Sequence, residues 1–448
     1  MPYALQIPLM PFEQILQLKP NERLLEIFDF LSPLAHPLLK ELEGTFEGKR
    51  GPDGYSCRAL LFALIAMFTE KISNRAKLVE RLKGDPRFAW VCGFDPFGPT
   101  PSEATFSRFF RDLSETPLLL ELFQDFVKKG CEMGHIGNEA AAVDGSHIHA
   151  YVTPPKPLKK KEKEALSPPQ AKTREEESSA ASCSSGHSPH PINSVNDLPT
   201  EPAWGAKRNP QGNVFYWYGY KIHIVLDTKS ELPVAFRVVS ANIHDKTVFL
   251  PLLKDLMETS PGVRFKYYIA DEAYDSQDIY TILRNEFEAQ AIIPLNTRGA
   301  KEPPPGFDFN GTPVCTAGLQ MVYWGSDGER NKFRCPEAAG KCRCPLQIEC
   351  SDSPYGLTVH CTIDDDPRRF SHPHRGTRHY EELKRKRSAV ERFNGRAKVH
   401  LKMDSLTVQG FSKVTAHMAL MCIAMIAGTL AQVKTQEKAD AVVLPKVA

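Results

Sequence analysis

Three acidic residues, far apart in the chain, stand where carboxylates could share metal ions. Asp144 ends an apolar run over residues 140–143, and Asp271 ends another over residues 267–270. Short apolar runs that stop at an acid predict buried strands whose carboxylates emerge at the sheet edge. Glu391 lies in a basic, helix-compatible stretch. Two such aspartates and one helical glutamate can hold two magnesium ions, which favour oxygen ligands and together promote in-line phosphoryl displacement.

The segments around these acids resemble the motifs of the DDE transposases of bacterial insertion sequences. The resemblance rests on residues 143–147, residues 269–275 and the span 387–398. The family's glutamate motif places Tyr, Arg, Glu and Lys with two, three and six residues between them. Arg387, Glu391 and Lys398 keep the last two spacings, and Lys384 stands in the tyrosine position. The resemblance covers roughly residues 50–151 and 204–433.

This resemblance implies a ribonuclease H-like catalytic core and a DNA transposase. Such an enzyme cleaves the ends of an insertion sequence and joins the 3′ ends to target DNA by two-metal phosphoryl transfer. Asp144, Asp271 and Glu391 would be the catalytic ligands of two Mg²⁺ ions, for which Mn²⁺ could substitute. The implied partners are double-stranded DNA, as terminal inverted repeats and target, and further copies of the chain. The implied location is the bacterial cytoplasm, in association with the nucleoid, and no membrane partner is implied.

Two other functions fit parts of the same evidence. The His147-x-His149 pair, with His244 and Asp245, resembles the ligands of a metallohydrolase that acts on a small molecule or phosphoester. A DNA-binding protein with a decayed catalytic site is the third interpretation, although all three acids are present. Taken alone, Asp144 followed by Gly145 is also a hairpin-turn dipeptide.

The charge distribution points to DNA more clearly than the net charge, which is only +2. Residues 368–402 contain twelve Lys or Arg and three Glu, a block that could neutralise phosphates, although a solvated basic surface is the alternative. Four of these cations share a helical face with Glu391 by spacing and are predicted to bind DNA, namely Arg387, Lys398, Lys384 and Lys402. Gly395 argues against an uninterrupted helix here.

A second DNA-binding element is predicted before the first aspartate. Ser102 is a suitable N-cap for a helix over residues 103–113. Its apolar side chains fall on one face, and Arg108 and Arg111 lie off that face. The two arginines could face DNA, as in a helix-turn-helix; a surface helix of a bundle is the alternative from these residues alone.

The remaining pattern predicts an α/β fold. Strands are expected before Asp144, over residues 215–227 and 232–239, into Asp271 and over 291–294, with helices over 245–257 and 277–288. This order matches a ribonuclease H-like mixed sheet with flanking helices, preceded by an all-α N-terminal domain and interrupted by a cysteine-rich insertion.

The predicted domain boundaries follow from these elements and from composition. Residues 152–203 are rich in Pro, Lys, Glu and Ser and are predicted to be disordered. The apolar run over residues 417–433 is predicted to be a buried helix, since it is shorter than the ~20 residues of a membrane span. The domains are a helical DNA-binding domain, 1–135; the first part of the core, 136–151 and 204–298; the disordered insert; the cysteine-rich insertion, 299–370; and the C-terminal helical part of the core, 371–435.

Six of the eleven cysteines fall within residues 315–361. In a chain without a visible secretory signal, such clustering favours metal binding over disulfides. The segment also has few apolar residues for a core, so a structural zinc ion is predicted to stabilise it. The predicted ligands are Cys335, Cys342, Cys344 and Cys350, with Cys315 and Cys361 in reserve. Free cysteines in a surface insertion are the alternative.

Overall fold

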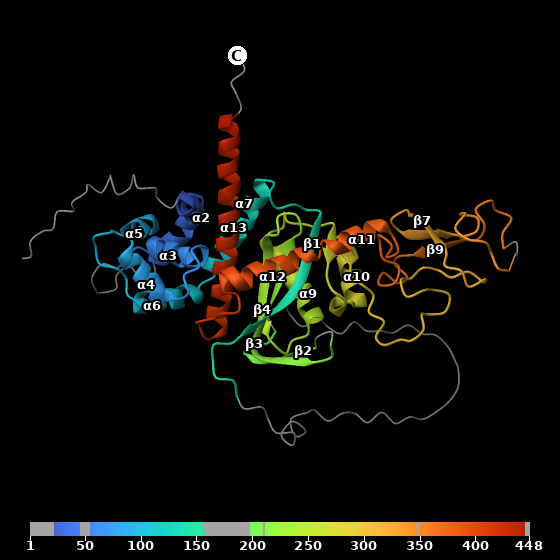
Figure 1. Cartoon of the computed structure of the whole chain (residues 1–448), viewed down its shortest axis with the longest axis horizontal. Helices are drawn as coiled ribbons and strands as arrows, with labels where there is room; N and C mark the ends of the chain where they lie inside the picture. The colour runs from blue at the N-terminus through green and yellow to red at the C-terminus, as the bar shows by residue number, and fades with distance from the viewer. Residues whose placement is uncertain (1–21, 45–53, 156–197, 209–210, 347–349, 444–448) are drawn as a thin grey trace, which may run out of the picture.

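The computed structural model describes residues 22–44, 54–155, 198–208, 211–346 and 350–443 (Figure 1). Its described N-terminal part consists of helices, namely α2 (Glu22–Gly44), α3 (Cys57–Thr69), α4 (Arg75–Gly84), α5 (Pro86–Cys92), α6 (Glu103–Ser114) and α7 (Leu118–Glu132). The predicted helix capped by Ser102 is α6, and the Ser102 side chain accepts a hydrogen bond from the Thr105 N–H at 3.2 Å. The predicted apolar face of α6 is buried.

A six-stranded mixed sheet forms the centre of the molecule. Its strands are β1 (Ala140–His149), β2 (Ala203–Arg208), β3 (Val214–Asp227), β4 (Pro233–Ser240), β5 (Tyr267–Ile269) and β6 (Gln290–Ile292). The order is β2-β3-β1-β5-β6, with β4 also paired to β3. The antiparallel β1, β3 and β4 and the parallel β5 and β6 confirm the predicted mixed sheet.

The sequence did not predict β2. It pairs antiparallel with the first half of β3, from Val214 to Gly219, whereas β4 pairs with the second half. Of the predicted insert 152–203, residues 156–197 lie outside the described residues, and β2 already begins at Ala203.

The helices that follow β4 pack against the sheet, and α13 also packs against the N-terminal helices. They are α9 (Asp245–Thr259), α10 (Gln277–Asn285), α11 (Arg378–Arg385), α12 (Ser388–Leu401) and α13 (Phe411–Val443). In Figure 1, α13 stands between the N-terminal helices and the sheet, and it contacts α2, α3, α6, α7 and β4. One apolar cluster runs from Leu24 through the sheet to Ala431.

Helix α13 is the buried C-terminal helix that the apolar run predicted. The helix is longer than the apolar run over residues 417–433, and its residues Phe411–Gln436 are long and apolar enough to cross a membrane by length and composition only. Of the 18-residue apolar window in that stretch, 83% is buried inside the protein, as in the core helix of a soluble fold. Burial against the other helices therefore accounts for its apolar character.

A second sheet lies between β6 and α11. Its antiparallel strands are β7 (Val322–Ser326), β8 (Arg330–Arg334) and β9 (Thr358–Thr362). The expectation that this segment lacks a core of its own was wrong: an apolar cluster forms from Met321, Phe333, Cys361 and Phe370. Figure 1 shows this small sheet at the end of the molecule away from the N-terminal helices.

Candidate catalytic site

The strand register places Asp144 and Asp271 side by side. Strands β1 and β5 are parallel neighbours in which Ala142 pairs with Ile269, and each aspartate lies two residues further along its chain. Neighbouring strands are about 4.8 Å apart, so the two carboxylates emerge at the same level of the sheet. Asp271 follows the end of β5, as predicted. The prediction that Asp144 ends its strand was wrong, because β1 continues to His149.

The positive charges near Asp144 and Asp271 do not offset the effect of burial on the pKa of either carboxyl group. Burial, with the nearby Asp271 carboxylate, raises the pKa of Asp144 to about 6 despite the Gly145 N–H, Arg387 and Lys207. Burial also raises the pKa of Asp271, again with Arg387 and Lys207 opposing. A bound cation would stabilise the ionised pair, so the electrostatics suit a divalent metal.

The oxygens of the two carboxylates are held by short-range hydrogen bonds. Asp144 Oδ1 accepts from the Gly145 N–H and Asp271 Oδ1 accepts from the Ala273 N–H, each at 2.9 Å. The second oxygen of each carboxylate takes no part in these two hydrogen bonds. Mg²⁺ is commonly bound through one or two carboxylates completed by water and substrate phosphates, so this donor set fits that ion.

A buried histidine explains the glycine after Asp144. The alternative that Asp144 and Gly145 form a hairpin turn was wrong, because both lie within β1 opposite Ile224 and His223. A Cβ on Gly145 would come 2.8 Å from His223 Cε1. His223 Nδ1 in turn lies 3.2 Å from the Tyr274 hydroxyl, three residues after Asp271. The histidine therefore joins the segments that carry the two aspartates.

Glu391 lies on α12 and reaches the aspartates through Arg387. Arg387 Nη2 donates to Glu391 Oε1 at 2.7 Å, and the same guanidinium lowers the pKa of both Asp144 and Asp271. The glutamate side chain is 60% exposed. The structure thus brings together Asp144, Asp271 and Arg387. Glu391 is connected to them through its ion pair with Arg387.

The other predicted cations of this region do not share one helical stripe. Lys384 belongs to α11, which ends at Arg385, and its ammonium lies 3.7 Å from Glu381. Lys402 is the left-handed C-cap of α12, and its Nζ is buried without a hydrogen-bond partner, which argues against the predicted DNA contact. Gly395 does not end the helix, so Lys398 stays on α12, where burial lowers the pKa of its ammonium and Asp404 and Asp144 oppose that shift.

Sequence reasoning missed several cations near the aspartates. Lys207 of β2 lowers the pKa of both carboxylates. A cavity of about 430 Å³ opens beside Asp271, and two exposed cations, Lys246 and Arg298, line it. No motif marks these residues; the pairing of β2 with β3, the first turn of α9 and the loop after β6 bring them to the site.

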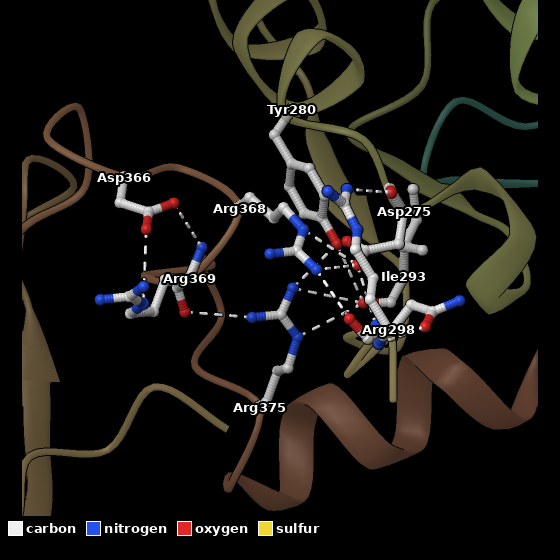
Figure 2. Close-up of polar contacts among 9 residues, drawn as sticks. Asp275, Tyr280, Ile293, Arg298, Asp366, Arg368, Arg369 and Arg375 are labelled. Carbon is white, nitrogen blue, oxygen red and sulfur yellow. Dashed lines mark hydrogen bonds and ion pairs between the residues drawn. The ribbon is translucent and has the colours of Figure 1, made fainter. Parts of the chain in front are cut away.

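One wall of the cavity is fixed by a buried ion pair (Figure 2). Asp275 Oδ2 accepts from Arg368 Nε at 2.9 Å and from the Asn296 N–H at 2.8 Å. Arg298 Nη2 approaches the Asp275 carbonyl at 3.5 Å. Because Arg368 follows the small sheet, this contact ties the β7–β9 segment to the catalytic side of the core.

The residues of the metallohydrolase interpretation do not form a shared site. His147 and His149 pack edge to face at 5.8 Å, while Asp245 pairs with Lys221 at 2.7 Å. His244 instead lines the cavity beside Asp271. Within the described ranges, no group of three or more His, Cys, Asp or Glu is arranged to hold a metal.

The predicted zinc ligands are likewise not gathered in the described part of the chain. Cys342 and Cys350 are exposed, and Cys335 and Cys344 are half-buried. Residues 347–349, next to Cys350, lie outside the described residues. Of the reserve ligands, Cys361 is buried in the apolar core of the small sheet.

The two arginines predicted to bind DNA in α6 lie off its buried face, and both are exposed. Arg111 donates to Asp112 at 2.8 Å, which neutralises part of its charge. Arg75 of α4 approaches α6 and donates to Ser107 at 3.2 Å.

Comparison with known proteins shows matches along most of the chain. A family described as "Transposase DDE domain" matches residues 139–343, a second of the same description matches 314–426, and "Transposase domain (DUF772)" matches 13–112. No curated protein matches. A solved structure titled "Cryo-EM structure of piggyBac transposase synaptic complex with hairpin DNA (SNHP)" is 11% identical and covers 93% of this chain and 75% of its own, with a TM-score of 0.38. That TM-score is too low to bear on fold or mechanism.

Proposed function

Since this chain belongs to the DDE transposases, we propose that it cuts the ends of its DNA element and joins the 3′ ends to target DNA at Asp144, Asp271 and Glu391. The observation that carries this proposal is the register of β1 and β5, which sets the two aspartates level on neighbouring parallel strands. The chain is a DNA transposase, and its cutting and joining steps and its catalytic residues are the proposal.

The side chains at the site have separate proposed roles in phosphoryl transfer. Asp144 and Asp271 would hold Mg²⁺, with Mn²⁺ as a substitute, and Glu391 would complete the ligand set after releasing Arg387. Two such ions, when bound, activate the attacking water or 3′ hydroxyl and stabilise the leaving oxygen. Arg387, Lys207 and Lys398 would neutralise the phosphates on either side of the scissile bond. No covalent protein intermediate is required.

The direct test uses DNA from the boundaries of the gene. Inverted repeats there would supply the substrate, and the purified chain should nick these ends in Mg²⁺ and join them to a second DNA. Absence of cutting and joining on repeat-bearing DNA, by folded protein in Mg²⁺ or Mn²⁺, would refute the proposal. Binding of two ends by more than one copy of the chain, at the bacterial nucleoid, belongs to the same proposal.

The N-terminal helices are proposed to bind DNA through α6. Replacing Arg108 and Arg111 together by alanine should weaken binding to the element's ends and lower the slope of log K against log salt by about 0.9 for each phosphate that is no longer neutralised. Arg108 should contribute more, because Arg111 is paired with Asp112. Binding can be followed by fluorescence anisotropy at several salt concentrations.

The matched control removes two positive charges from α7. Lys128 and Lys129 pair with Asp125 and Glu132 on the same helix, so their double alanine variant should bind DNA nearly as the parent does. If the α6 and α7 variants have the same affinity and salt slope, α6 is a bundle helix and does not bind DNA.

A structural zinc ion on Cys335, Cys342, Cys344 and Cys350 stays a prediction. Protein prepared under reducing conditions without chelator should contain about one zinc per chain, since thiolate ligation is coupled to local folding. Metal analysis measures this directly. Zinc well below one per chain in the parent, equal to that of a Cys342→Ser/Cys344→Ser variant, would leave these cysteines as ordinary thiols beside an apolar core.

A further inference from the structure

One face of the small sheet carries a row of cations on its central strand. In β8 the buried Asn331 and Phe333 alternate with Arg330, Lys332 and Arg334, so the three cations lie on the face turned away from the apolar core. Four residues of strand separate the first cation from the last, which is about 13 Å at 3.2–3.4 Å per residue. A row of this length can neutralise more than one phosphate of a DNA backbone.

The neighbouring strands leave this row open. Lys332 pairs with Gly325 of β7 and with His360 of β9, and Arg334 pairs with Thr358 of β9. Directly paired residues of antiparallel strands have their side chains on the same face. His360 and Thr358 are exposed, and glycine has no side chain that could cover Lys332. We call this surface the basic face and define it as Arg330, Lys332, Arg334, Trp324, Thr358 and His360.

An exposed tryptophan holds Arg334 in place. Trp324 of β7 is 57% exposed, and the Cζ of Arg334 lies 3.4 Å from the centroid of its ring. A guanidinium that stacks on an indole is attracted by the ring and is oriented before any ligand arrives. Within the described ranges no carboxylate pairs with Arg334, and its Nε is buried without a hydrogen-bond partner. Arg334 is therefore a fixed cation that the described part of the chain does not neutralise.

Acidic residues lie at the other end of the row. Asp327, in the turn between β7 and β8, lies 3.3 Å from Arg330 and 3.2 Å from Lys332. Glu329 is exposed in the same turn. Asp327 neutralises one of the three positive charges, and Glu329 lowers the positive potential further at the Arg330 end. An anion is therefore attracted most strongly to the part of the basic face at Arg334 and Lys332.

The small sheet is attached to the catalytic core at a defined place. Arg368, which follows β9, donates to Asp275 at 2.9 Å, and Asp275 lines the cavity beside Asp271. Figure 1 shows the N-terminal helices and the small sheet at opposite ends of the molecule, with the central sheet between them. DNA on the basic face would thus contact the chain at the end away from α6.

We infer that the basic face binds the phosphate backbone of duplex DNA, with Arg334 and Lys332 as its principal contacts and Thr358 as a hydroxyl donor. A guanidinium suits phosphate because it can donate two parallel hydrogen bonds. The groups of this face recognise charge, and Arg334 already occupies a face of the Trp324 ring on which a base would stack, so a duplex fits better than a single strand. The inference gives this transposase a DNA contact outside both the catalytic site and α6.

DNA binding by the full-length protein, measured by fluorescence anisotropy at several salt concentrations, tests the inference. The probes are a duplex of arbitrary sequence, three helical turns or about 30 base pairs long, and a single strand of the same length. Divalent metal is left out. Arg334→Ala should weaken duplex binding about tenfold, since charge-assisted hydrogen bonds are among the stronger single contacts. The slope of log K against log salt should fall by about 0.9, the value for one phosphate.

Two comparisons separate a phosphate site from a change in net charge. Arg378→Ala removes an exposed cation that pairs with Glu382 on α11, so it should bind duplex as the parent does. Trp324→Ala removes no charge, yet it should weaken duplex binding about threefold, because Arg334 loses the ring that orients it. In the Arg334→Ala background the same change should have no further effect. Thermal melting of each variant confirms folding, and Trp324→Phe should retain the parental affinity.

Two outcomes would overturn the inference. One is an Arg334→Ala protein with the same duplex affinity and salt slope as Arg378→Ala, and the other is a loss of affinity confined to the single strand. Either result leaves the proposed cutting and joining untouched, because no metal is present and no DNA is cut in this assay. If instead the parent cuts no element ends but Arg334→Ala selectively loses the duplex, the proposed function fails and the basic face remains a DNA-binding surface.

Discussion

Replacing Asp144 or Asp271 by asparagine should reduce strand cleavage by at least about 10³-fold, since metal ions contribute several kcal/mol of transition-state stabilisation and each 1.36 kcal/mol is tenfold in rate. Asparagine keeps the size of the side chain but removes the charge that would hold the metal. Affinity for DNA should change little, because the cations around the pair remain. Cleavage of labelled element ends, alongside anisotropy, measures both quantities.

Asp278→Asn is the matched control for these variants. This aspartate lies on α10, seven residues after Asp271, and is exposed. Its variant should cleave at the parental rate. If Asp144→Asn retained cleavage within about tenfold of the parent, less than 1.4 kcal/mol of barrier would depend on that carboxylate and Asp144 would not be a metal ligand.

Because the pKa of Asp144 is raised, the rate of cleavage should also depend on pH. A carboxyl with a pKa of about 6 is mostly protonated below pH 6, and metal must displace that proton. Cleavage at limiting Mg²⁺ should therefore fall as the pH drops below 6, and more Mg²⁺ should move the midpoint to lower pH. A midpoint that does not respond to Mg²⁺ would assign the titration to another group.

Glu391→Gln distinguishes two roles for the glutamate. In the structure its carboxylate is held by Arg387, which also faces Asp144 and Asp271. If Glu391 is a ligand, the variant should lose cleavage as the aspartate variants do. If it only positions Arg387, cleavage should survive at high Mg²⁺ with weaker DNA affinity.

The position of Asp271 could be predicted from sequence because a short apolar run does end with its strand. The same reasoning failed at Asp144, where the apolar run stops although β1 continues. At Asp144 the strand leaves the apolar core and enters the site, so its side chains become polar while its backbone stays paired with β3. The alternation after Asp144, with Ile148 buried and His149 exposed, was the available signal of a continuing strand.

Features that depend on long-range packing were beyond the sequence. Strand β2 contains Gly205 and two alanines, which have weak strand propensity, and it forms because β3 pairs with it and Trp217 covers the glycine. The break between α11 and α12 separates Lys384 from Glu391, and no local signal marks it. Likewise, the packing of α13, together with contacts of α7 with β4 and of α3 with α12, joins the N-terminal helices and the sheet into one core.

Arg375 should be among the most sensitive residues for stability. It is 4% exposed and donates to the Tyr280 hydroxyl at 2.8 Å, to the Arg369 carbonyl at 3.0 Å and to the Ile293 carbonyl at 3.3 Å (Figure 2). Arg375→Met would fill similar volume but remove these hydrogen bonds, and although the Tyr280 hydroxyl still donates to the Ile293 carbonyl at 3.1 Å, the Arg369 carbonyl would lose this donor, at about 1–3 kcal/mol for an unsatisfied buried group. We expect a total loss of about 3 kcal/mol on this scale.

The loss of stability should be concentrated where the small sheet joins the core, because Arg375 links the segment after β9 to β6 and α10. Hydrogen exchange and limited proteolysis within residues 299–370 should accelerate by about 10²-fold, the equivalent of about 3 kcal/mol in an opening equilibrium. Arg378→Met is the control: that side chain is 93% exposed and pairs with Glu382, a surface ion pair worth about 0–1 kcal/mol. Equal protection in the two variants would mean that other contacts, among them the ion pair of Arg368 with Asp275, attach the small sheet to the catalytic core without Arg375.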